Sequence, residues 1–174
     1  MEPMEVDSGE SRPGQIILSW GRSASGELGI DDSSGEKNIR VPTVVTAFQR
    51  ERARAPVIDI ACGKQHTVIL LEDGQVYSAG SNESKQLGHE KRGSEPEKLN
   101  ILETQIIKLV ACGEAFTIVL NADNQLYSFG SNDKGQLGYR TQGKKFSERP
   151  RFVKPFNQYF QKVDFQNTVY PAYQ

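Results

Sequence analysis

Short apolar runs separated by polar segments that contain Gly, Asp or Asn are the main pattern along this chain. Runs of this length are typical of β-strands, because an amphipathic helix needs a periodic pattern over about ten residues or more. A run that contains a proline suits an edge strand, since proline cannot donate to the ladder. We predict strands at 16–20, 41–45, 57–61, 66–71, 76–79, 96–99, 106–111, 116–120, 126–129 and 151–154, with another beginning at 162–165.

Two of the gaps between these runs predict hairpins. Asp73-Gly74 lies between two apolar runs, which favours a type I′ turn because that turn needs positive φ at both central residues. In the later gap, 122–125, Asn124 takes the place of the glycine, and Asn is the non-glycine residue that best tolerates the left-handed region.

The same stretch of sequence occurs nearly three times. Residues 57–88 and 106–138 match in register, so that Cys62 and Cys112 are 50 residues apart, and a partial copy begins at Ile16. A period of 20–50 residues indicates a solenoid, propeller or array, and four short strands per period is the content of one propeller blade. The shared or equivalent positions, which we interpret as structural, are Gly21, Gly26, Leu28, Gly29, Cys62, Gly63, His66, Gly80, Asn82, Leu87, Gly88, Cys112, Gly113, Phe116, Gly130, Asn132, Gly135, Leu137 and Gly138.

The repeat divides the chain into five regions. Residues 1–15 are expected to be a disordered acidic leader, and 16–56 a partial first repeat with a charged insertion at 49–54. Residues 57–105 and 106–155 are the two full repeats. In residues 156–174 the pattern fails, which predicts a truncated or divergent tail.

Composition narrows the class of protein. The net charge of −1 gives the molecule no overall field for nucleic acid, and no apolar run is long enough to insert into a membrane. The leader lacks an apolar core, so the protein is not expected to be secreted. Two cysteines then predict reduced, buried thiols in the cytoplasm, with the nucleus as the alternative compartment and a disulfide as the less favoured state.

The segments ACGKQHTVIL, VYSAGSN and KQLG, with ACGEAFTIVL and LYSFGSNDKGQLG, resemble the regulator of chromosome condensation (RCC) repeat. The resemblance covers about residues 16–154 and implies a seven-bladed β-propeller. The fold class is therefore predicted as all-β, an incomplete RCC-type propeller of about two and a half to three four-stranded blades. The acidic leader followed by Trp20-Gly21 is similar to the secretion-regulating exchange-factor branch. Retinitis pigmentosa GTPase regulators and the RCC-like domains of HECT ubiquitin ligases are alternatives.

No residue has a pattern that indicates catalysis, a cofactor or a metal ion. Gly26-Glu27-Leu28-Gly29 lacks the Lys-Ser/Thr pair of a phosphate-binding loop. His66 could be a ligand or a base, but Phe116 at the equivalent position favours a strand residue that hydrogen-bonds a neighbouring loop. His89 is expected to be solvated.

Two further groups of polar residues recur or cluster. Asn82 and Asn132, with Ser81 and Ser131, are expected to hold the loop after the third strand through side-chain to backbone hydrogen bonds. A basic cluster at 144–154 is either a solvated face or a surface for an acidic partner; it consists of Lys144, Lys145, Arg149, Arg151 and Lys154.

These observations favour a non-catalytic protein–protein interaction module. The resemblance implies two alternatives: part of an exchange factor or regulator for a Ran-like small GTPase, and the N-terminal RCC-like domain of a HECT ubiquitin ligase. Seven repeats of 50 residues need about 350, twice the 174 present, so a truncated, spliced or incomplete chain is expected. Its open blade edges predict self-association or poor cooperativity.

Overall fold

The computed structural model describes residues 15–30, 37–48, 55–91, 93–102 and 104–154. Ten strands and two short 3-10 helices lie in these ranges. They are β1 (Leu18–Arg22), β2 (Asn38–Val44), η1 (Thr46–Phe48), β3 (Val57–Cys62), β4 (His66–Leu71), β5 (Val76–Gly80), β6 (Gly93–Lys98), η2 (Asn100–Leu102), β7 (Ile107–Cys112), β8 (Phe116–Asn121), β9 (Leu126–Ser131) and β10 (Phe146–Phe152).

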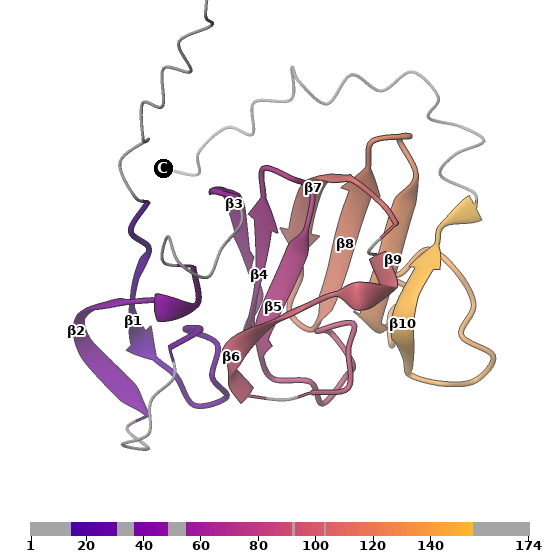
Figure 1. The fold of residues 1–174 in the computed structure, drawn as a ribbon. Helices are drawn as coiled ribbons and strands as arrows, with labels where there is room; N and C mark the ends of the chain where they lie inside the picture. The colour runs from indigo at the N-terminus through magenta and orange to yellow at the C-terminus, as the bar shows by residue number, and fades with distance from the viewer. Residues whose placement is uncertain (1–14, 31–36, 49–54, 92, 103, 155–174) are drawn as a thin grey trace, which may run out of the picture.

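The strands form three antiparallel sheets that stand side by side (Figure 1). Within the described residues, the first blade has only β1 and β2. The second has the order β3-β4-β5-β6, and the third has β7-β8-β9-β10. Each four-stranded sheet is a meander, in which every strand pairs with the next one along the chain. Short turns join the first three strands, and a longer loop leads to the fourth. The prediction of an all-β, incomplete propeller of about two and a half to three blades is confirmed.

The main core lies between the second and third blades. Strand residues that point toward the neighbouring sheet are apolar, and their alternation along each strand puts them on one face. The buried members of this core are Val68, Leu70, Val76, Leu99, Leu102, Ile107, Val110, Val119 and Phe129. A second cluster, between the first and second blades, contains Ile30, Val45, Phe48, Val57, Ile69 and Leu71.

Each blade ends in an outer strand that contains a proline. These are Pro42, Pro96 and Pro150, each 54 residues after the one before. The pairing register shifts beside each of them. An outer strand tolerates proline because its missing N–H faces away from the sheet. The edge position of the 41–45 strand is confirmed. The predicted starts at 96 and 151 were wrong, since β6 begins at Gly93 and β10 at Phe146, so both prolines lie inside their strands.

The hairpin between β4 and β5 does not use a type I′ turn, so that prediction was wrong. Gly74 has φ of 79°, but Asp73 is not among the residues with positive φ. The Gly74 N–H donates to the Leu71 carbonyl (2.9 Å), and the Leu71 N–H donates to the Gln75 carbonyl (2.9 Å). This is a three-residue loop with one left-handed residue at its end. Asn124 occupies the equivalent place with φ of 58°, as its tolerance of this conformation predicts.

Three sequence predictions lie outside the described residues. They are the disordered leader over most of its length, the charged insertion at 49–54, and the tail with its strand at 162–165.

Candidate functional site

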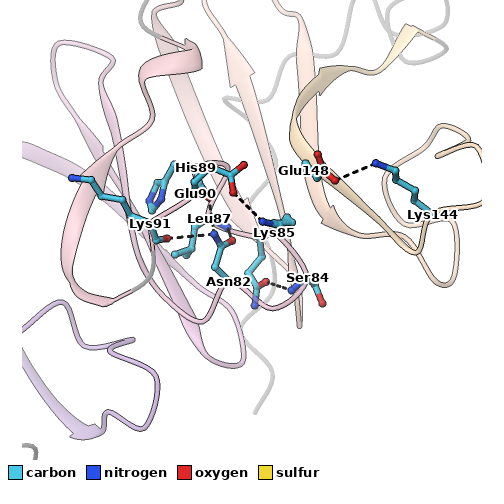
Figure 2. A network of polar contacts seen from close by, with 10 residues as sticks. Asn82, Ser84, Lys85, Leu87, His89, Glu90, Lys91, Lys144 and Glu148 are labelled. Atoms are coloured by element: carbon cyan, nitrogen blue, oxygen red, sulfur yellow. Dashed lines mark hydrogen bonds and ion pairs between the residues drawn. The ribbon is translucent and has the colours of Figure 1, made fainter.

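The loops that follow β5 and β9 are held in shape by an asparagine at the start of each. Asn82 Oδ1 accepts from the Leu87 N–H (3.2 Å), while Asn82 Nδ2 donates to the His89 carbonyl (2.6 Å) and the Lys91 carbonyl (3.3 Å), as Figure 2 shows. Asn132 makes the matching bonds in the third blade. The amide thus supplies backbone-like donors and acceptors inside the loop, where water is excluded.

Two further side chains hold each loop, and the sequence interpretation missed them. The Ser78 hydroxyl donates to the Leu87 carbonyl (2.8 Å), and Ser128 repeats this bond to Leu137 (2.8 Å). Gln86 Oε1 accepts from the Ser84 N–H (2.9 Å). The signal was present in the sequence, because Ser78 and Gln86 recur 50 residues later as Ser128 and Gln136.

Ser81 and Ser131 do not act as their sequence position suggested. Their backbone N–H groups donate to the carbonyls of Gln65 (2.7 Å) and Ala115 (2.8 Å), across the sheet. The Ser131 hydroxyl accepts from the Gln136 side chain (3.2 Å) rather than donating to the backbone. The reason is that both serines lie at the end of the third strand, directly before the asparagine that begins the loop.

A threonine in the second strand of each four-stranded blade bonds to the loop of the blade before it. Thr117 Oγ1 donates to the Gln86 carbonyl (2.8 Å), and Thr67 Oγ1 donates to the Glu27 carbonyl (2.6 Å). Thr67 and Thr117 are 50 residues apart and were also missed by the sequence interpretation. This bond connects successive repeats and fixes their spacing.

His66 belongs to the same boundary between the second and third blades. Its Nε2 lies 3.1 Å from Thr117 Oγ1, whose proton is directed at Gln86, so Nε2 is the donor in this contact. The ring is 1% exposed, and burial lowers the pKa of His66 to about 4. Such a group hydrogen-bonds a neighbouring element and is not placed as a general base for an external substrate.

His89 is not the solvated residue that the sequence suggested. Its Nε2 lies 3.0 Å from Ser78 Oγ, and the ring is half-buried against the loop. Burial lowers the pKa of His89, although hydrogen bonding at Ser78 opposes the shift. His89 is shielded from solvent because the loop that Asn82 holds brings it back against Ser78 on β5.

The two cysteines differ in exposure. Both are free, but Cys62 is exposed, so its interpretation as a buried apolar residue was wrong. Cys112 Sγ lies 3.5 Å from the Ala61 carbonyl, and burial raises the pKa of the Cys112 thiol to about 12. Cys62 instead lies beside the two-stranded first blade, which does not cover its side chain.

Several of the repeated glycines lie where rings or backbone pass close to the chain. A side-chain carbon at Gly63 would lie 2.1 Å from His66 Cε1, and one at Gly113 would lie 1.9 Å from Phe116 Cε1. Leu87 and Leu137 are buried beneath the loops. The repeat positions therefore build the blades and leave the charged residues to face outward.

Charged side chains cover the loop face between the second and third blades. Lys85 Nζ lies 3.0 Å from Glu90 Oε2, and Lys144 Nζ lies 3.1 Å from Glu148 Oε1 (Figure 2). The hydrogen bond from Lys85 is the main cause that lowers the pKa of the Glu90 carboxyl, and the charge of Arg149 adds to it. The loops of the two blades are thus close enough for Arg149 to act electrostatically on Glu90.

An apolar groove of about 300 Å³ lies between β1 and the second blade. Ile60, Cys62 and Ile69 form one wall, and 17–20 form the other. Ile60 is 42% exposed, whereas Val110 at the equivalent place in the third blade is 9% exposed. The difference arises because β1 has no inner strand beside it within the described residues.

The described residues contain no group of three His, Cys, Asp or Glu side chains that could hold a metal ion. In the same part of the chain, no helix is long and apolar enough to cross a membrane.

The fold and its loops define an RCC-type repeat propeller. Family models for the regulator of chromosome condensation (RCC1) repeat match residues 57–86 and 107–136 in one case, and 16–70, 73–120 and 123–165 in the other. The chain belongs to the RCC1 repeat family.

Relatives are longer than this chain. It is 41% identical over 94 residues to the human probable E3 ubiquitin-protein ligase HERC4, which is 54% of this chain and 8% of HERC4. It is 35% identical over 72 residues to human RCC2, covering 41% of this chain and 12% of RCC2. The fold also resembles Prp20p from Saccharomyces cerevisiae, with a TM-score of 0.65 and 24% identity, over 82% of this chain and 34% of Prp20p.

Proposed function

We propose that this chain is a non-catalytic protein-binding module of RCC type. The observation that carries the proposal is the loop scaffold around Asn82 and Asn132, which fixes the backbone and presents charged side chains outward. Pre-ordered loops lose little conformational entropy when a partner binds. Both histidines are used in structural hydrogen bonds, so the site offers surface and not proton transfer.

A second proposal is that the chain is part of a regulator of a Ran-like small GTPase. It is supported by the fold that the chain shares with Prp20p, whose structure was described together with its binding properties to Gsp1p and histones. A third is an RCC-like domain of a HECT ubiquitin ligase, supported by the 41% identity to HERC4. In either case the cytoplasm is the proposed compartment, with the nucleus as the alternative.

The experiment compares binding with nucleotide release. The 174-residue chain is titrated against a purified Ran-type GTPase and against core histones, and release of fluorescent GDP from the GTPase is followed in parallel. We expect binding to at least one protein without faster release, and weaker binding for Asn82→Ala and Asn132→Ala. Faster release would favour the GTPase regulator. No binding to either protein would contradict the module.

A separate proposal concerns self-association. The apolar groove and the edge of β1 that no other described strand pairs with would accept a strand from a second copy of this chain, since such an edge offers N–H and C=O groups for pairing. The partner strand would be β7 of the third blade, which pairs with β8 alone among the described strands and on which Leu109 is 41% exposed.

A further inference from the structure

The end of the third blade carries an excess of positive charge. Residues 140–154 contain six basic side chains and one acidic one; they are Arg140, Lys144, Lys145, Glu148, Arg149, Arg151 and Lys154. The equivalent stretch of the second blade, 90–100, is shorter and contains three of each. The fold therefore does not require this charge.

The charge changes at individual equivalent positions. Arg151 lies opposite Ser128 in the β10–β9 ladder, and Glu97 lies opposite Ser78 in the β6–β5 ladder. Since Ser78 and Ser128 are equivalent, Arg151 replaces an acidic residue at the same place on the outer strand. Glu95 and Arg149 are related in the same way across their prolines. Two neighbouring reversals change an acidic strand into a basic one.

Three of these basic residues line a hollow of about 280 Å³, and Lys145 lies next to Lys144 in the chain. Lys144, Arg149 and Arg151 line it together with Phe146, whose half-buried ring provides an apolar part of the lining. We call the four side chains Lys144, Lys145, Arg149 and Arg151 the basic ridge.

The ridge is partly fixed before any partner arrives. The Arg151 guanidinium lies 4.7 Å from the centre of the Tyr139 ring, and the Tyr139 hydroxyl donates to the Ser128 carbonyl (2.7 Å). Stacking on an aromatic ring orients a guanidinium and leaves its N–H groups available. Lys145 and Arg149 form no ion pair with another described residue.

We propose that the basic ridge binds an acidic, extended segment of a partner protein, with an apolar side chain of that segment placed against Phe146. This rests on the proposed function and names the kind of partner. Charge complementarity selects the segment, because carboxylates match the fork of an arginine. Side chains carry the recognition, since Pro150 removes an N–H that strand addition to β10 would use.

A protein segment is favoured over nucleic acid by the charges around the ridge. Glu148 lies inside the hollow, and Glu90 is near enough to Arg149 for that arginine to lower the pKa of its carboxyl. The whole chain also has a net charge of −1. A phosphate backbone carries one negative charge per nucleotide and would meet these carboxylates, whereas a peptide can place uncharged residues opposite them.

The test uses the full chain and three fluorescein-labelled probes. One is a short Glu-rich peptide with a central Leu, the second has every Glu replaced by Gln, and the third is a single-stranded oligonucleotide. Anisotropy titrations at low and at physiological ionic strength compare the native chain with Arg149→Glu/Arg151→Glu. Lys108→Glu, which changes an exposed lysine on β7, is the matched control.

We expect the Glu peptide to bind about tenfold more tightly than the Gln peptide or the oligonucleotide, and binding to weaken at higher salt. The double reversal should weaken it by about tenfold or more, and Lys108→Glu by less than about twofold. Far-UV circular dichroism shows whether the double variant is folded, and Arg149→Gln/Arg151→Gln serves as the milder variant if it is not.

Equal affinity of the native chain and the folded double variant for the Glu peptide would overturn the proposal, and so would tighter binding of the oligonucleotide. If the double variant still binds the GTPase or the histones as the native chain does, the ridge fails while the protein-binding module stands. If the native chain binds the Glu peptide but neither protein, the ridge stands and the proposed protein-binding module fails.

Discussion

His66 Nε2 lies 3.1 Å from Thr117 Oγ1, and the same hydroxyl donates to the carbonyl of Gln86 at 2.8 Å. The buried Thr117 hydroxyl on β8 thus joins a side chain of β4 to the loop after β5, at the boundary between two blades. Apolar contacts hold the blades together, but they are non-directional. Hydrogen bonds at this point set how one repeat is placed on the next.

Thr117→Val should destabilise the fold by about 2 kcal/mol. Valine has nearly the same shape, but it leaves His66 Nε2 and the Gln86 carbonyl buried without their partner. The loss is measured from urea unfolding of the full chain followed by circular dichroism. Thr43→Val is the control, because its hydroxyl bonds only the nearby Val41 carbonyl in an exposed strand. Equal effects of the two changes would contradict the role of Thr117.

His66 should make stability depend on pH. Its pKa is about 4 in the fold and 6.5 when unfolded, so between these values the unfolded chain binds more protons. Stability from this group is complete above about pH 6.5 and is lost as pH falls toward 4, by on the order of 3 kcal/mol in total. His66→Phe should flatten this part of the profile, since Phe116 occupies the equivalent place beside Gly113. An unchanged profile would show that other groups cause it.

Gly26 and Gly135 should respond differently to alanine. Both have positive φ, 84° and 78°, which costs a side chain about 1–2 kcal/mol. A side-chain carbon at Gly135 meets open space, whereas one at Gly26 would lie 2.6 Å from the Ser94 backbone. Gly135→Ala should therefore lower stability by about 1 kcal/mol and Gly26→Ala by clearly more, as measured by urea midpoints. The reverse order would mean that the first blade is not packed on β6.

Self-association should depend on the groove beside β1. Ile60→Asn places a polar side chain in a wall of the groove and should shift sedimentation velocity profiles of the chain toward the monomer. Val41→Asn is the matched control, because Val41 is 65% exposed and does not line the groove. A chain that is monomeric at all concentrations, or that is affected equally by both changes, would exclude association through this groove.

Sequence repetition alone determined the class of fold. Matching glycines and apolar runs at a spacing of 50 residues predict four strands per unit, because the two-residue alternation of a strand is visible locally. Asn124 in the left-handed region followed from its residue type, as did Pro42 on an edge strand. These features depend on neighbours in the chain, so a sequence contains them.

Only the tertiary structure decided how the repeats interact. The Thr117–Gln86 and His66–Thr117 bonds join residues 31 and 51 positions apart, and no local pattern specifies such pairs. His89 was expected in solvent and Cys62 in the core, and both were wrong because burial depends on which blade stands beside each residue. The basic residues of 144–154 could be counted in the sequence. Only the fold shows that Lys144, Arg149 and Arg151 line one hollow, which β10 and the loop before it form around Phe146.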